Sequence, residues 1–364
     1  MPARRLPVYP YLDQLRRQAK DLLRALHAGD AGALADLKQF HTKQIDPAKA
    51  RLADAQLVLA RSYDASGWTR LVLACKLIDA IWRDDLETVR SIIEKNPKLL
   101  HENAGIRNNN WGPPMSYAAN VGRDAIICML YEHGARDLEH AIGRATLQGK
   151  IETANMLYEM LGAPPIPKGA LGGPAYTLSS TGTAFLFEHG ATVLDENGAT
   201  TAPVDVVICS DSRKPAEKHR ILEMYVQHGA QPPDTPVMAL HRGRIDLLEE
   251  HLRRDPRLFE RTFSHHEIFP AEFGCSEYVD TQGTPLHGTT LLHMCVDWDE
   301  FEIAEWLVEK GVDVNAKSAV DPNGFGGYTA LFGAVVCYAN SGATIGAKHL
   351  IRASRGYCSI TERM

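Results

Sequence analysis

The tripeptide His-Gly-Ala occurs three times in the chain, and each copy follows an apolar stretch with helical spacing. The copies begin at His133, His189 and His228, and a related stretch at residues 306–312 ends in Gly-Val. A glycine directly after an apolar helix is typical of a left-handed C-terminal cap, because a side chain at that position costs energy. A helix end that recurs in this way predicts repeated helical units rather than unrelated globular domains.

A second, shorter helical pattern precedes two of these caps. Residues 113–122 begin with two prolines, and residues 290–295 begin with a threonine. Both starts suit the first turn of a helix, since threonine caps it and proline presets its backbone angle. The repeated unit is therefore helix, tight turn, helix and glycine cap.

These residues resemble the ankyrin repeat, whose pattern is roughly T-P-L-H-x-A-A followed by an apolar helix and G-A-D-x-N. Residues 290–316 fit that pattern without a gap, and so do residues 114–135, although Ser116 replaces the motif histidine. Weaker copies extend the resemblance over residues 76–350. The resemblance implies an all-α fold, an ankyrin-repeat solenoid of about eight helix-turn-helix units of which several are degenerate.

The predicted array has a leader, an insertion and a tail. Residues 1–75 are expected to form a helical N-terminal capping module, with an apolar stripe from Leu12 to Leu26 and a helix start at Asp46-Pro47. Residues 259–289 are expected to be an insertion, and residues 351–364 a short tail. The leader and array together are similar to bacterial-type ankyrin-repeat proteins.

Charge and composition exclude several classes of protein. The 364 residues carry a net charge of −6, so nothing favours nucleic acid as a partner, and no apolar run is long enough to span a membrane. The chain is expected to be soluble and cytoplasmic. Its seven cysteines are scattered, without a C-x-x-C pair, and are interpreted as small buried apolar residues.

The charge is unevenly distributed. Residues 1–76 contain 13 basic and 7 acidic side chains, whereas the remainder contains 26 basic and 38 acidic ones. The acidic array favours a basic partner. The basic leader is interpreted as a solvated helical surface, with binding to an anionic membrane or nucleic acid as the alternative.

No phosphate-binding loop, dinucleotide fingerprint, nucleophile elbow or H-E-x-x-H motif is present, and no cofactor is expected. The best candidate for chemistry is the 259–289 insertion, which is rich in histidine and acidic residues. Imidazole, thiolate and carboxylate are zinc ligands. The alternative function is thus an enzyme or metal-dependent protein, with hydrolase-like activity, whose candidate ligands are His265, His266, Glu267, Cys275 and His287. Against this, the side chains of adjacent histidines diverge, and an ordinary polar loop is favoured.

The ankyrin resemblance implies a non-catalytic protein-protein interaction scaffold, which binds a protein partner on a concave face made by finger tips and first helices. A monomer is expected. Candidate partner-binding residues lie at predicted finger tips or in a helix-helix turn: Asn108, Asn109, Asn110, Trp111, Trp298, Phe325 and Tyr328. Trp111 is the leading anchor, since tryptophan is enriched where partners bind tightly. Packing of Trp111 beneath the neighbouring finger is the equally weighted alternative.

Overall fold

The computed structural model describes residues 4–107, 110–210, 213–275, 286–321, 324 and 326–332. The chain divides into two compact units, the first ending at Pro164 and the second beginning at Pro165. Both units are helical. Across the described residues, extended pairing is confined to three isolated bridges, Leu194 with Thr200, Phe263 with Thr289 and Lys317 with Thr329.

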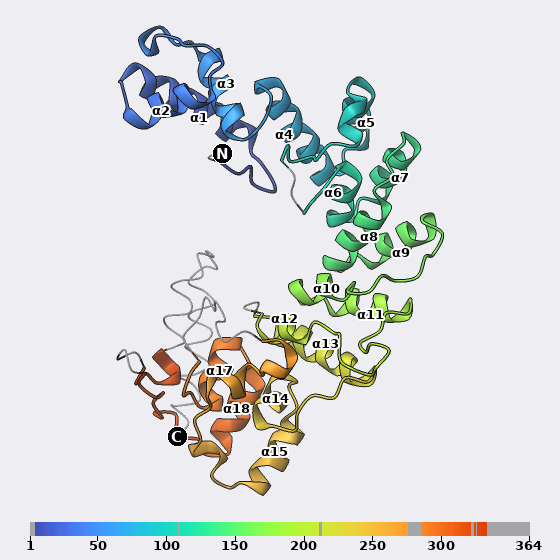
Figure 1. The fold of residues 1–364 in the computed structure, drawn as a ribbon, viewed down its shortest axis with the longest axis vertical. Helices are drawn as coiled ribbons and strands as arrows, with labels where there is room; N and C mark the ends of the chain where they lie inside the picture. The colour runs from blue at the N-terminus through green and yellow to red at the C-terminus, as the bar shows by residue number, and fades with distance from the viewer. Residues whose placement is uncertain are drawn as a thin grey trace. The chain divides into compact units, whose positions relative to one another are not determined.

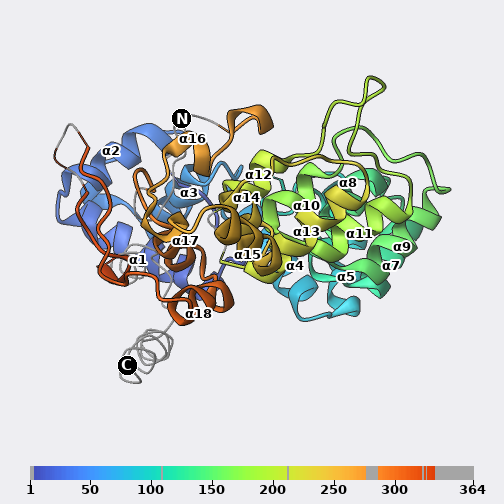
Figure 2. The same ribbon diagram turned by 90° about the horizontal axis from the view of Figure 1, so that it is seen from below.

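The first unit opens with helices that pack around one apolar core. They are α1 (Leu12–His27), α2 (Ala31–Phe40), η1 (Pro47–Lys49) and α3 (Leu52–Ser62). The predicted stripe of α1 is buried at Leu15, Ala19, Leu22 and Leu26. The Asp46 side chain accepts a hydrogen bond from the Ala48 backbone, so the predicted cap is present, but it starts only the short η1, and α3 begins separately at Leu52. Figure 2 shows α1, α2 and α3 grouped together.

The boundary predicted after residue 75 falls inside a helix. Helix α4 runs from Trp68 to Trp82, and Leu71 and Cys75 belong to the same apolar core as α1–α3. The change in charge composition at residue 76 therefore marks no structural boundary. Charged residues lie mostly on the solvent-exposed surface. The boundary of a structural module depends instead on buried apolar contacts, which charge composition does not show.

The rest of the first unit consists of paired helices. These are α4 with α5 (Leu86–Lys95), α6 (Pro114–Val121) with α7 (Asp124–Glu132), and α8 (Leu138–Leu147) with α9 (Ile151–Met160), and η2 (Pro97–Leu100) follows α5. Figure 1 shows the first helices α4, α6 and α8 in one layer and α5, α7 and α9 in the other. Each pair thus buries its apolar side against the next.

The His-Gly-Ala segments end helices as predicted. Gly134 and Gly229 both have a φ of +106°, which favours glycine. The ring of the preceding histidine donates to the last turn: His133 Nδ1 lies 2.8 Å from the Met129 carbonyl oxygen, and His228 Nδ1 lies 2.8 Å from that of Met224. Histidine and glycine together satisfy the helix end.

The second unit continues the pairing in its described residues. The pairs are α10 (Gly172–Thr177) with α11 (Ser180–Glu188), α12 (Val204–Ile208) with α13 (Pro215–Gln227), α14 (Pro236–His241) with α15 (Ile245–Arg254), and α17 (Leu291–Trp298) with α18 (Phe301–Glu309). The last predicted unit begins before Phe332. Its continuation, residues 333–350, and the predicted tail, residues 351–364, lie outside the described residues.

The predicted insertion begins as a compact extension of the second unit. It contains the end of η3 (Leu258–Glu260), then α16 (His265–Ile268) and η4 (Ala271–Phe273). The Phe263–Thr289 bridge joins its two ends, with the Phe263 nitrogen 2.8 Å from the Thr289 carbonyl oxygen. His241 Nε2 on α14 donates to the Ile268 carbonyl oxygen at 2.8 Å. The insertion therefore packs on the preceding helix pair, although residues 276–285 lie outside the described part.

Candidate functional site

Four aromatic rings lie in a row in the first unit, and we call them the aromatic cluster: Tyr9, Trp82, Trp111 and Tyr117. Ring centroids are 5.1 Å apart between the first two, 6.3 Å between the tryptophans and 4.8 Å between the last two. Tyr9 is 47% exposed, the two tryptophans are half-buried and Tyr117 is buried. The cluster therefore offers partly open aromatic faces that rest on a fixed base.

Arg144 brings a positive charge to this cluster. Its guanidinium carbon lies 5.6 Å from the centre of the Trp111 ring, a cation–π contact. The side chain is buried, and its Nε donates to the Asn120 side chain at 2.8 Å. Burial lowers the pKa of Arg144 from its usual value. The arginine is thus held in place by α6 while its charge faces Trp111.

A serine, a histidine and an aspartate meet beside Arg144. The His140 Nδ1 atom lies 2.8 Å from the Ser116 hydroxyl, and both the hydroxyl and the backbone nitrogen of Ser116 donate to Asp137. In a hydrolase triad the carboxylate would instead orient the histidine ring. Ser116 is also fully buried. The arrangement fits a network that joins α6 to α8, at the position where the repeat pattern has its histidine.

The predicted partner-binding residues have different outcomes. Asn110 is exposed and Trp111 is half-buried within the aromatic cluster, whereas Asn108, Asn109 and Phe325 lie outside the described residues. Tyr328 is half-buried between His293 and Phe332, at ring distances of 5.7 and 5.8 Å. Of the described candidates, Asn110 and its sequence neighbour Trp111 belong to the first unit, whereas Trp298 and Tyr328 belong to the second.

Trp298 is not an exposed anchor. It ends α17 and is only 7% exposed. Its ring lies 4.5 Å from that of His241 and 6.2 Å from that of Phe269. The sequence pattern placed Trp298 in a turn, but α17 continues to this residue and directs its ring into the interior, against α14 and the insertion.

The metal-ligand candidates of the insertion do not converge. The rings of His265 and His266 are 5.9 Å apart and nearly perpendicular, Glu267 caps α16 through Ser264, and His287 is exposed. No group of three histidine, cysteine or acidic side chains is arranged for a metal within the described residues. Adjacent histidines in one helical turn diverge, which is the physical reason.

A buried ionisable cluster in the second unit has no counterpart in the sequence predictions. Its centre is Lys218 on α13, which is 3% exposed and whose Nζ has no hydrogen-bond partner in the described part of the chain. The ammonium lies 4.2 Å from the centre of the Trp298 ring. Burial lowers the pKa of Lys218 to about 8, against the opposing attraction of Glu300. The side chain of Glu300 is 2% exposed and accepts from His219 Nε2 at 2.9 Å.

Lys218 could not have been identified from its sequence context. The surrounding residues, Glu217 to Arg220, are polar and charged, as on a solvated helix face. Burial comes from α17 and the insertion, which are distant in sequence.

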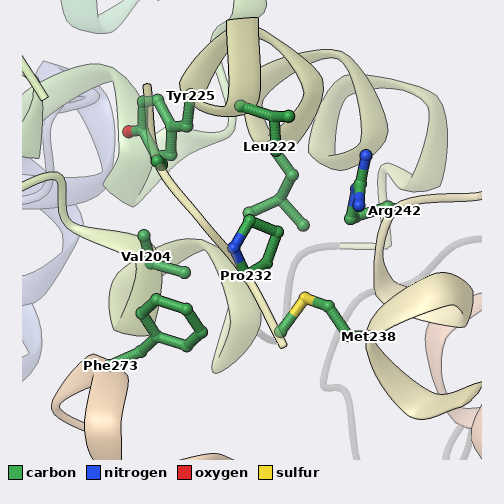
Figure 3. A pocket seen from close by; sticks show the side chains of 9 residues that line it. Val204, Leu222, Tyr225, Pro232, Met238, Arg242 and Phe273 are labelled. Atoms are coloured by element: carbon green, nitrogen blue, oxygen red, sulfur yellow. The ribbon is translucent and has the colours of Figure 1, made fainter. Parts of the chain in front are cut away.

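A cavity lined partly by α13 in the second unit is too small for a ligand. It has a volume of about 10 Å³, near the least that a single water requires. Its lining is apolar apart from Arg242 and includes Val204, Leu222, Pro232, Met238 and Phe273 (Figure 3). The cavity is a packing gap between α12, α13, α14 and the insertion.

Comparison with known proteins bears on the last described helix pair. A family model matches residues 284–319. The family is the ankyrin repeat. In this ankyrin repeat the motif histidine, His293, lies 2.9 Å from the Thr290 hydroxyl and 3.0 Å from the Tyr328 carbonyl oxygen. No curated protein matches the chain. The resemblance to ankyrin-repeat proteins is thus supported at this repeat, and ankyrin repeats are typically non-catalytic interaction modules.

No helix among the described residues is both long and apolar enough to cross a membrane.

Proposed function

We propose that the chain is a non-catalytic scaffold that binds a protein partner through the aromatic cluster of its first unit. The proposal also holds that the chain contains about eight stacked ankyrin units, is a monomer and lies in the cytoplasm. Stacked repeats present a preformed surface, so little conformational entropy is lost on binding.

The row of partly open rings supports this proposal. Tyr9 and Trp111 expose aromatic surface, while Tyr117 beneath them is fixed by donating its hydroxyl proton to the Val8 carbonyl oxygen. Burial raises the pKa of Tyr117 to about 12, so this donor keeps its proton at neutral pH. Rigid aromatic side chains give a large contact area at a small entropic cost.

A basic segment is the partner chemistry that the net charge favours. Residues 77–364 carry 26 basic and 38 acidic side chains, which attracts positively charged chains over the distance that salt permits. Raising the salt concentration should therefore slow association more than it speeds dissociation.

The test is affinity capture with the wild-type chain and Trp111→Ala, followed by a binding measurement with the captured partner. Truncation of a central anchor costs about 2 kcal/mol or more, which is about thirtyfold in Kd. Tyr176→Ala is the matched control, because Tyr176 is 71% exposed and belongs to the second unit. Circular dichroism of both variants checks that the fold is retained.

Two results would contradict the proposal. One is a folded Trp111→Ala variant that keeps every partner at wild-type affinity. The other is stoichiometric zinc in the purified protein that is lost on His265→Ala, His266→Ala or His287→Ala, which would favour the metal-dependent alternative.

A further inference from the structure

Two cysteines from distant parts of the sequence meet in the second unit. Cys209 follows α12, and Cys275 follows η4 of the insertion. The two thiols lie close enough for each to be the largest single influence on the pKa of the other. Cys275 is 7% exposed and Cys209 is half-buried, and neither forms a disulfide. Of this pair, therefore, Cys209 is the more accessible sulfur.

The backbone geometry holds the two residues together. The Cys209 nitrogen donates to the Asp205 carbonyl oxygen at 2.8 Å. Cys209 and Asp205 therefore lie one turn apart on the same face of α12. A Cβ atom on Gly274 would lie 3.8 Å from the Asp205 Cγ. Phe273 and Val204 line the same cavity, as Figure 3 shows. The segment that ends at Cys275 is therefore packed on the helix that ends at Cys209.

The positive charge of Lys218 interacts electrostatically with both cysteine side chains. Its ammonium is buried without a hydrogen-bond acceptor among the described residues, and its charged form is favoured by Glu300, Cys209, Asp297 and Cys275. A hydrogen bond with Cys275, supported by this charge, lowers the pKa of Cys209. The same bond and burial raise the pKa of Cys275. This asymmetry favours the thiolate form at Cys209 and the protonated form at Cys275.

We propose that Cys209 and Cys275 form a peroxide-sensitive thiol pair that closes to an intramolecular disulfide. The Cys209 thiolate attacks one oxygen of hydrogen peroxide, the O–O bond breaks, and the departing hydroxide takes up a proton to become water. The sulfur of Cys275 then attacks the resulting sulfenic acid. The S–S bond forms, the S–O bond breaks, and the hydroxyl leaves with the Cys275 proton as a second water. Two thiols are oxidised and one peroxide is reduced to two waters.

The disulfide would tie the insertion to the α12–α13 helix pair. Because it closes a long loop of the unfolded chain, oxidation should raise the Tm of the second unit by about 5 °C. Addition of a reducing thiol should reverse this rise.

The experiment treats the purified full chain with hydrogen peroxide, blocks remaining thiols by alkylation, and maps peptides by mass spectrometry without reduction. The expected product is a peptide pair joined through Cys209 and Cys275, lighter than the two free peptides by two hydrogens. Cys275→Ser should leave Cys209 as a sulfenic acid that dimedone captures. Cys209→Ser should abolish the cross-link and leave Cys275 reduced. Cys128, an exposed thiol on α7, is the internal reference for a cysteine without this environment.

Lys218 is tested separately. Lys218→Met should slow oxidation of Cys209 severalfold, because loss of the ammonium charge lowers the fraction of Cys209 present as thiolate. Lys218→Arg keeps the charge and should react at close to the wild-type rate. Disulfides that join other cysteines in preference to Cys209 and Cys275 would refute the proposed thiol pair. Dimedone labelling of Cys209 in Cys275→Ser that is no faster than labelling of Cys128 would refute it too, and this readout does not require the Lys218 variants to fold.

Discussion

Lys218 is a charged side chain that the fold buries. A buried ammonium is stable only when other groups replace the water it loses. Here the replacement consists of the Trp298 ring, 4.2 Å from Nζ, and the attraction of Glu300. These contacts are weaker than hydration, and burial accordingly lowers the pKa of Lys218 from 10.5 to about 8. The corresponding cost is on the order of 3 kcal/mol.

This cost predicts how stability responds to alkaline pH. Between pH 8 and 10.5 the unfolded chain holds the Lys218 proton and the folded chain releases it, so the free energy of unfolding should rise with pH. Relative to Lys218→Met, which cannot titrate, the wild type should gain up to about 3 kcal/mol across this window. Urea denaturation of both proteins at several pH values measures the difference.

Lys214→Met is the control for that comparison. Lys214 precedes the same helix but is exposed, and its Nζ donates to the Thr177 carbonyl oxygen at 3.0 Å. If Lys214→Met reproduced the pH dependence of Lys218→Met, burial of Lys218 would not be its cause. A difference between Lys218→Met and the wild type that stays constant with pH would show that Lys218 does not titrate as the structure indicates.

Helix α17 shows how a single element is tied to the next repeat. Thr290 precedes the helix, and His293 in its first turn lies 2.9 Å from the Thr290 hydroxyl. The other ring nitrogen donates to the Tyr328 carbonyl oxygen at 3.0 Å. His293 is only 4% exposed, so both bonds replace bonds to water. One imidazole thus joins the helix start to the following segment.

Substitution His293→Ala should therefore destabilise the chain by about 2–3 kcal/mol, since it removes two hydrogen bonds and leaves buried polar groups unpaired. His228→Ala removes an exposed imidazole from a helix end and should change stability by no more than about 0.5 kcal/mol. Thermal or urea denaturation compares the two. Equal effects would mean that His293 is not a special contact of the repeat.

At the scale of the whole molecule, both units contain histidines whose pKa is lowered by the folded structure. Burial lowers the pKa of His241 and His293 in the second unit, whereas partial loss of solvation and the charge of Arg144 lower that of the exposed His140 in the first. Each folded pKa lies below 6.5, so in mildly acidic solution the unfolded chain binds more protons than the folded one. Stability is then present above pH 6.5 and is lost as the pH falls through the folded pKa values.

The chain should consequently lose stability as the pH falls from about 6.5 to about 5, before most carboxylates begin to protonate. His241→Gln should flatten this dependence, because His241 is fully buried and its pKa is lowered furthest. Calorimetric or urea measurements at several pH values provide the slope for each protein. Unchanged wild-type stability over this range would contradict the neutral buried histidines.

Local patterns predicted much of the architecture. The His-Gly-Ala segments, the prolines and threonines at helix starts, and the apolar spacing placed the described helix pairs, because capping and amphipathic burial depend on residues within a few positions. The same reasoning identified Trp111 as a residue of interest and located the ankyrin repeat that the family model matches at residues 284–319.

The sequence by itself determined the helices, their ends and the resemblance to a repeat array. Tertiary structure alone decided that Trp298 is buried, that α4 continues across the predicted boundary, and that Lys218, Cys209 and Cys275 meet. Helix formation follows from neighbouring residues, whereas burial and pKa values depend on what other segments bring close. Such long-range contacts leave no periodic trace in the residues that make them.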